Sequence, residues 1–155
     1  MAKMDALDRQ ILALLQDDAS LPIQKIANQV GLSVNPCWRR IRRMEAGGII
    51  KRRVALVDPE KVGLTLTIFV RVKTREHSAA WAAQLTEVIA SMDEISECHR
   101  IGGDVDYLLK VTVPDIAGYD RIYKELIARV PNLTDVSALF SMERLKSSTR
   151  LSIPA

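Results

Sequence analysis

The sequence predicts an α+β protein with two parts. A winged helix-turn-helix over residues 1–53 and a linker over residues 54–62 precede a βαββαβ ferredoxin-like (RAM) domain over residues 63–155. Apolar residues recur with a helical period up to residue 46, whereas β-prone segments alternate with helical ones after residue 63. A chain of 155 residues has room for one domain or for two small ones, which fits this division.

Three helices are predicted before the glycine pair at positions 47 and 48. The first, near residues 5–16, carries an apolar stripe and begins at Asp5, a good N-cap. Pro22 suits the first turn of the second helix, and Gly31 ends it. Ser33 caps the third helix after a short glycine-containing joint, which is typical of a helix-turn-helix. The β-prone residues 50–56 then predict the strand of a wing.

The remaining elements alternate between strand and helix. Strands are expected over residues 65–74, 95–101, 107–113 and 133–142, with helices after Ser78 and before Pro131. This order interleaves two βαβ units into a four-stranded antiparallel sheet with both helices on one face.

Charge divides the chain unevenly. Residues 1–53 carry 10 Lys and Arg against 5 Asp and Glu, a net +5, whereas residues 54–155 carry 12 against 14, a net −2. A polyanionic partner is therefore expected to meet the N-terminal part.

The third helix has an apolar face and an opposite basic face. We expect Asn35 and Arg39 to read base edges in the major groove of double-stranded DNA, and the other basic residues mainly to bind phosphates. Trp38 lies at the edge of the apolar arc, where packing is the alternative to a DNA contact. A merely solvated basic face is the alternative for the whole surface. The predicted DNA-binding residues are Ser33, Asn35, Pro36, Trp38, Arg39, Arg40, Arg42, Arg43, Lys51 and Arg52.

A glycine-rich turn joins the two middle strands of the second part. Its sequence is Gly102-Gly103-Asp104-Val105-Asp106. Backbone N–H groups beside two carboxylates could hold the carboxylate and ammonium groups of an amino acid. An ordinary hairpin turn with solvated acids is the alternative, since glycine and aspartate are common turn residues.

Motifs in both parts resemble the Lrp/AsnC family, the feast/famine regulators of bacteria and archaea. The first part offers Val30-Gly31-Leu32-Ser33, Pro36-Cys37, Arg42-Arg43-Met44-Glu45 and Gly48-Ile49-Ile50. The second offers Glu97-Cys98-His99 and the run from Gly103 to Asp115. The resemblance covers nearly the whole chain. It implies a sequence-specific DNA-binding transcriptional regulator that responds to a small amino acid, as a homodimer assembling into tetramers or octamers.

The same resemblance implies an effector bound between neighbouring dimers. The residues that it assigns are Arg100, Ile101, Gly102, Gly103, Asp104, Asp106, Tyr107, Leu139 and Ser141. Arg100 departs from the leucine-responsive relatives, which have an apolar residue there. It could pair with an effector carboxylate or, as the alternative, with Asp104 or Glu97 on the surface. A narrower resemblance, to the cysteine-responsive DecR-like subgroup, rests on Pro36-Cys37-Trp38, Val54-Ala55-Leu56, Asp58-Pro59-Glu60-Lys61 and His77-Ser78 before Trp81. It implies a role in cysteine or sulfur amino-acid metabolism.

Other functional classes have less support in the sequence. No catalytic triad, nucleophile beside a base or phosphate loop is visible, so we expect neither an enzyme nor a cofactor. The pair Cys98-His99 is too small a set for a metal site, and Cys37 and Cys98 are expected to be reduced thiols. With no signal peptide or membrane segment visible, we expect a cytoplasmic protein. An RNA-binding sheet and an amino-acid-binding regulatory subunit of a metabolic enzyme are the alternatives.

Overall fold

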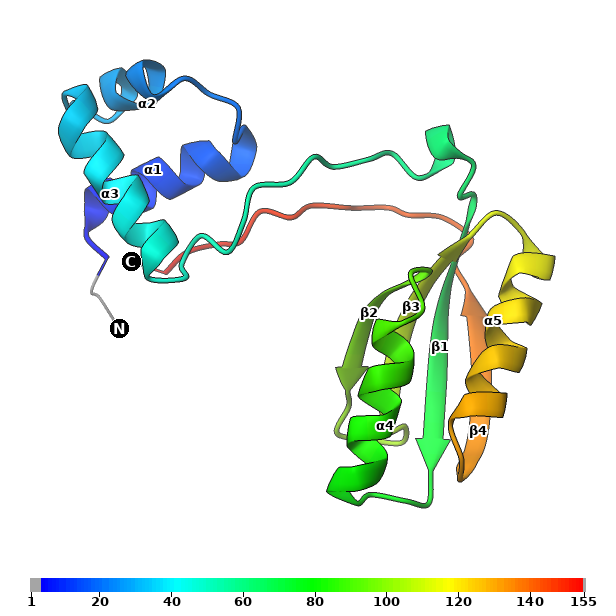
Figure 1. The fold of residues 1–155 in the computed structure, drawn as a ribbon. Helices are drawn as coiled ribbons and strands as arrows, with labels where there is room; N and C mark the ends of the chain where they lie inside the picture. The colour runs from blue at the N-terminus through cyan, green and yellow to red at the C-terminus, as the bar shows by residue number, and fades with distance from the viewer. Residues whose placement is uncertain (1–3, 155) are drawn as a thin grey trace. The chain divides into compact units, whose positions relative to one another are not determined.

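The computed structural model describes residues 4–154, which form two compact units (Figure 1). The first unit contains residues 4–56 together with residues 146–154, and the second runs from Val57 to Leu145. The last residues of the chain were expected in the second part. The structure instead groups them with the first unit, because they make hydrogen bonds to the first helix and Ile153 packs against the core of that unit.

The first unit consists of the three expected helices, α1 (Ala6–Asp17), α2 (Ile23–Gln29) and α3 (Val34–Ala46). Gly31 adopts a φ of +68°, a left-handed conformation that favours glycine, directly after α2. The short turn lets the apolar faces of α2 and α3 meet α1 in one core. That core contains Ile11, Leu12, Ile26, Ala27, Val30, Cys37, Ile41 and Met44.

The wing strand predicted over residues 50–56 is not formed in this structure, which describes all of these residues. They have no strand pairing, and the residues from Lys51 to Leu56 are exposed. A strand requires a neighbouring strand to receive its backbone hydrogen bonds. Within the described residues no backbone amide from position 51 to 56 donates a backbone hydrogen bond, so β-propensity alone did not produce a strand.

The second unit confirms the predicted βαββαβ order. Its elements are β1 (Leu66–Thr74), α4 (Ala79–Ala90), β2 (Ile95–Arg100), β3 (Tyr107–Val113), α5 (Ile116–Arg129) and β4 (Leu133–Phe140), preceded by the short 3₁₀ helix η1 (Glu60–Val62). The strand order is β2-β3-β1-β4, and every neighbouring pair is antiparallel. None of the helices within residues 4–154 is long and apolar enough to cross a membrane.

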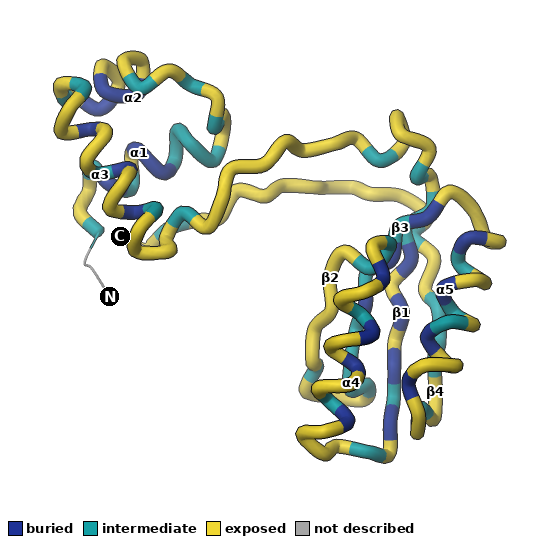
Figure 2. The backbone as a smooth tube through the Cα atoms, in the orientation of Figure 1, coloured by how far each residue is buried: buried dark blue, intermediate teal, exposed yellow. Residues whose placement is uncertain are grey.

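Both helices of the second unit cover the same face of the sheet (Figure 1). Figure 2 shows buried positions alternating along β1, as expected for a strand with one covered face. The covered core contains Ile68, Val70, Val72, Trp81, Leu85, Val88, Met92, Leu109, Val111, Val113, Ile122, Leu126 and Val130. On the opposite face Phe69 is paired with Leu139, and these residues are 36% and 48% exposed. An apolar pair therefore lies on the face that the helices leave open.

Candidate DNA interface and effector loop

Helix α3 separates an apolar face from a polar one. Cys37, Ile41 and Met44 are buried in the core, whereas Asn35 and Arg39 are exposed. Burial raises the pKa of the Cys37 thiol, which therefore stays neutral and packs as a small apolar residue. Ser33 lies at the N-cap position, but its side chain makes no capping hydrogen bond. The exposed face of α3 thus has the composition expected of a recognition helix.

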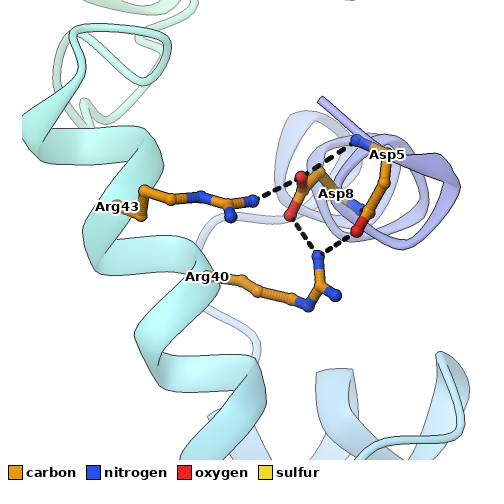
Figure 3. A network of polar contacts seen from close by, with 4 residues as sticks. All are labelled: Asp5, Asp8, Arg40 and Arg43. Atoms are coloured by element: carbon orange, nitrogen blue, oxygen red, sulfur yellow. Dashed lines mark hydrogen bonds and ion pairs between the residues drawn. The ribbon is translucent and has the colours of Figure 1, made fainter. Parts of the chain in front are cut away.

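Two of the four predicted arginines hold α3 against α1 (Figure 3). Arg40 donates to Asp5 Oδ2 at 2.6 Å and to Asp8 Oδ1 at 2.9 Å, and Arg43 donates to Asp8 Oδ2 at 2.5 Å. The Asp8 side chain is 0% exposed, whereas the Arg40 and Arg43 side chains are 24% and 52% exposed. We call Asp5, Asp8, Arg40 and Arg43 the α1–α3 clamp. Arg40 therefore has a structural role that its position on the helix did not predict.

The two carboxylates of the clamp also cap α1. Asp8 N donates to Asp5 Oδ1 at 2.9 Å, and Asp5 N donates to Asp8 Oδ2 at 3.1 Å. This is a capping box in which an aspartate takes the place of the usual glutamate or glutamine. Asp5 was predicted as the N-cap of α1, whereas the reciprocal role of Asp8 was not predicted. The spacing of the two acids at the start of an amphipathic helix was the available signal.

Electrostatics favours the charged forms within the clamp. The hydrogen bond from the Asp8 backbone, followed by that from Arg40, lowers the pKa of Asp5 below its ordinary value. Hydrogen bonds to Asp5 and then to Asp8 raise the pKa of Arg40. Because the Asp5 pKa is depressed in the folded state, its contribution to stability is present above the unfolded value of about 3.9 and is lost as the pH falls through the folded pKa.

The remaining predicted DNA contacts lie on the surface. Arg42 lies over the ring of Trp38, with its guanidinium carbon 5.5 Å from the ring centroid, and Trp38 is 50% exposed. Arg42 also makes a long ion pair with Glu45, at 3.4 Å. Arg39 has no ion pair or side-chain hydrogen bond within the described residues, and Pro36, Lys51 and Arg52 are exposed. Arg39 is therefore the α3 arginine most available to a ligand.

The predicted effector loop between β2 and β3 is closed by Asp106. Ile101 N donates to Asp106 O at 2.8 Å, and Asp106 N donates to Val72 O at 3.0 Å. The Asp106 carboxylate accepts a hydrogen bond from Thr74 N at 2.8 Å. One carboxylate expected to bind an ammonium group thus already fastens the loop to the end of β1. Asp104, Gly102 and Gly103 remain exposed.

Arg100 is exposed at the end of β2 and is paired across the sheet with Tyr107. A surface pair with Asp104 or Glu97 was the expected alternative to an effector contact. Within residues 4–154, neither pair is formed. Glu97 instead accepts from Lys110 at 2.7 Å and lies 3.3 Å from His99, and these two contacts lower its pKa. Arg100 therefore keeps its donors available beside the loop.

Leu139 and Ser141 lie away from the loop within one chain. Tyr107 is paired with Val72, whose partner in β4 is Val136, whereas Leu139 is three residues further along. At about 3.4 Å per residue, this separation is roughly 10 Å along the strand, and Ser141 is further still. The structure therefore gathers Arg100, Ile101, Gly102, Gly103, Asp104, Asp106 and Tyr107 at one end of the sheet, and leaves Leu139 and Ser141 towards the other.

Both units match known domain families. Residues 4–45 match the AsnC-type helix-turn-helix domain, and residues 67–151 match the Lrp/AsnC ligand binding domain. The second match alone covers more than half of the chain. The matched residues contain both covering helices, the loop between β2 and β3, and all of the sheet except Leu66 at the start of β1.

The similarity to related proteins extends over nearly the whole chain. The glutamate uptake regulatory protein of Zymomonas mobilis is 50% identical over 152 residues, covering 98% of this chain and 92% of its own length. The DNA-binding transcriptional activator DecR of Escherichia coli K12 is 45% identical over 150 residues, covering 97% and 99%.

Solved structures share the fold. The crystal structure of an AsnC family transcriptional regulator from Agrobacterium tumefaciens is 50% identical, with a TM-score of 0.92 over 96% of this chain and 97% of its own. A transcriptional regulator from Neisseria meningitidis, in complex with L-Met, is 27% identical with a TM-score of 0.91, covering 97% of each chain.

A helix-turn-helix with an exposed basic recognition helix, joined to a ferredoxin-like ligand-binding domain, defines a class of DNA-binding transcriptional regulators. This chain belongs to the Lrp/AsnC family of such regulators.

Proposed function

We propose that α3 enters the major groove of an operator, with Asn35 and Arg39 at base edges and Arg42, Lys51 and Arg52 at phosphates. Arg39 carries this assignment: it is exposed, it has no ion pair within residues 4–154, and the other face of its helix is fixed in the core. Arg40 has a mainly structural role, because the clamp pairs it with two carboxylates. Arg43 binds Asp8 but its side chain also remains partly exposed to solvent. Ser33, Pro36 and Trp38 complete the proposed contact surface.

We also propose that the protein binds DNA as a homodimer, which assembles further into tetramers or octamers. The open sheet face with Phe69 and Leu139 supports an association between copies, since an apolar surface gains free energy when it is covered. Two recognition helices would then meet half-sites about one helical turn apart, or a multiple of that spacing.

Replacing Arg39 with alanine tests the DNA interface. We expect affinity to fall by roughly 5- to 150-fold for each half-site, because a good bidentate base contact contributes about 1–3 kcal/mol. The operator would be selected from a random-sequence DNA library by the protein itself, and affinity measured by fluorescence anisotropy. Arg121→Ala, which removes an exposed arginine from α5, is the matched control and should bind as the wild type does. Wild-type affinity in Arg39→Ala would refute the assignment of the recognition helix.

For the effector, we propose a small amino acid held by Arg100 and the loop from Ile101 to Tyr107, with Leu139 and Ser141 supplied by a neighbouring protomer. Arg100 is exposed beside a loop in which Gly102 and Gly103 are also exposed, and this arrangement supports a ligand with a carboxylate group. The resemblance to the DecR-like subgroup favours cysteine, and the relatives named above make glutamate and methionine the next candidates.

A thermal-shift panel tests this assignment. We expect L-cysteine at millimolar concentration to raise the melting temperature more than serine, alanine, leucine, glutamate or methionine do, because a ligand that binds only the folded state stabilises it. In Arg100→Ala the shift should disappear, whereas Arg121→Ala should retain it. A larger shift with glutamate or methionine would reassign the effector, and a shift that survives Arg100→Ala would remove this side chain from the site.

A further inference from the structure

The segment 146–154 lies against α1 of the DNA-binding unit. The side chain of Gln16 makes two hydrogen bonds to the backbone of Leu151: its Nε2 donates to the carbonyl at 3.3 Å, and its Oε1 accepts from the amide at 2.6 Å. A glutamine that pairs with both backbone groups of one residue reproduces the pairing of a neighbouring strand. This attachment therefore recognises backbone rather than a particular side chain.

Three more contacts extend the attachment along the same helix. Arg150 Nη1 donates to both carboxylate oxygens of Asp17, at 2.6 and 2.8 Å, and Arg9 Nε donates to Pro154 O at 3.0 Å. Ile153 packs against the core of the first unit. Arg9 and Gln16 are seven residues apart, two helical turns, so they lie on one face of α1. The segment thus follows α1 over most of its length, and we call residues 146–154 the strap.

Two connections join the DNA-binding unit to the sheet, and both leave the sheet at one end. One leads into the start of β1 at Leu66, and the other follows the end of β4 at Phe140. Ser141 N donates to Thr67 O at 2.9 Å, which holds these two strand ends together. Ser141 is also one of the proposed effector residues. The end of β4 is therefore separated from the strap by only five residues of chain, 141–145.

We propose that the strap is a positioning device that transmits the state of the sheet unit to the recognition helix. It holds α1, and α1 holds α3 through the buried Asp8 carboxylate of the clamp. A shift of β4 would thereby alter the support of α3 without any direct contact with DNA. We call this transmission from the sheet unit to α3 the relay. The relay rests on the proposed DNA-binding function, whereas docking of the strap on α1 does not.

Gln16→Ala tests the docking of the strap in the full-length protein. We expect hydrogen exchange of the Leu151 amide to accelerate by roughly tenfold, because this amide loses its acceptor, the Gln16 side chain. Gln10→Ala, an exposed glutamine on the same helix, is the matched control and should leave the exchange unchanged. A second variant, Ile153→Ser, should give the same acceleration through loss of the apolar contact. Equal exchange in Gln10→Ala and both strap variants would overturn the docking.

The relay is tested in reverse, by adding operator DNA, because coupling between two sites is reciprocal. In the wild type we expect bound DNA to slow exchange in residues 139–145, and in Gln16→Ala this protection should be lost at DNA concentrations that still saturate the protein. Protection that is absent from the DNA-bound wild type, or equal in Gln16→Ala, would overturn the relay. Failure of the wild type to bind any selected DNA would instead refute the proposed function, and the exchange comparison without DNA would still test the strap.

Discussion

Asp8→Ala is expected to lower the free energy of unfolding of the DNA-binding unit by about 2–3 kcal/mol. Removing one partner of a fully buried ion pair costs about 3–5 kcal/mol, and the value here is smaller because Arg40 and Arg43 both reach solvent. The substitution also removes half of the capping box at Asp5. Hydrogen exchange of α1 and α3 amides in the full-length protein would measure the change, as an acceleration of roughly 30- to 150-fold.

Gln10→Ala serves as the control on α1, since Gln10 is exposed and alanine favours a helix. Its exchange rates should match those of the wild type, and amides of the sheet strands should exchange alike in both variants. If Asp8→Ala exchanged no faster than Gln10→Ala across α3, the clamp would contribute nothing to the position of the recognition helix. If Asp8→Glu, which keeps the carboxylate, recovered slow exchange, the effect of Asp8→Ala would be due to loss of the charge rather than to loss of packing.

The clamp changes how the basic face of α3 is interpreted. Four arginines on a short helix predict a phosphate-binding surface, because like charges on one face repel each other. The structure relieves much of that repulsion internally, by directing Arg40 and Arg43 towards Asp8. A variant that removes Arg43 would therefore confuse loss of DNA contact with loss of support. Arg39 avoids this ambiguity, and for this reason the DNA test uses it.

Local patterns explain which parts of the fold could be predicted. Three features depend on neighbouring residues in the sequence and were predicted within a few residues: the apolar stripe of the first helix, which includes the buried Ile11, the end of α2 at Gly31, and the strand periodicity of β1. The antiparallel sheet with both helices on one face could be predicted because βαβ connections are restricted in hand. The family could be identified from the same motifs, such as Pro36-Cys37 in α3 and the glycine-rich turn before Tyr107.

Features that depend on distant pairing were missed. Asp8 and Arg43 are 35 positions apart, and Gln16 and Leu151 are 135 positions apart, so no local pattern joins them. The predicted wing strand is not formed for a related reason. A β-prone segment needs a partner strand, and the described part of the chain supplies none to residues 50–56. The structural role of Asp106 could not be predicted either, because its carboxylate accepts a hydrogen bond from the backbone amide of Thr74, which lies on another strand.

Operator binding is expected to weaken by about 10³-fold between 50 and 200 mM salt. Arg42, Lys51 and Arg52 of each protomer give six phosphate contacts in a dimer, and a slope of about −0.9 per contact predicts a total slope near −5 in a plot of log K against log salt concentration. The double variant Lys51→Ala/Arg52→Ala removes four of these contacts, so the slope should become shallower by about 3.6. Affinity measured by anisotropy at four salt concentrations would give both slopes.

The matched control is Arg121→Ala/Lys124→Ala on α5, which changes the net charge by the same amount but removes cations that are paired with Glu94 and Asp120. Its slope should equal that of the wild type, which would show that contact rather than overall charge sets the salt dependence. Arg39→Ala should weaken binding with a nearly unchanged slope, because a base contact displaces few counterions. If the Lys51 and Arg52 variant kept the wild-type slope, the exposed residues after α3 would not lie on the phosphates, and the proposed DNA interface would be confined to α3 itself.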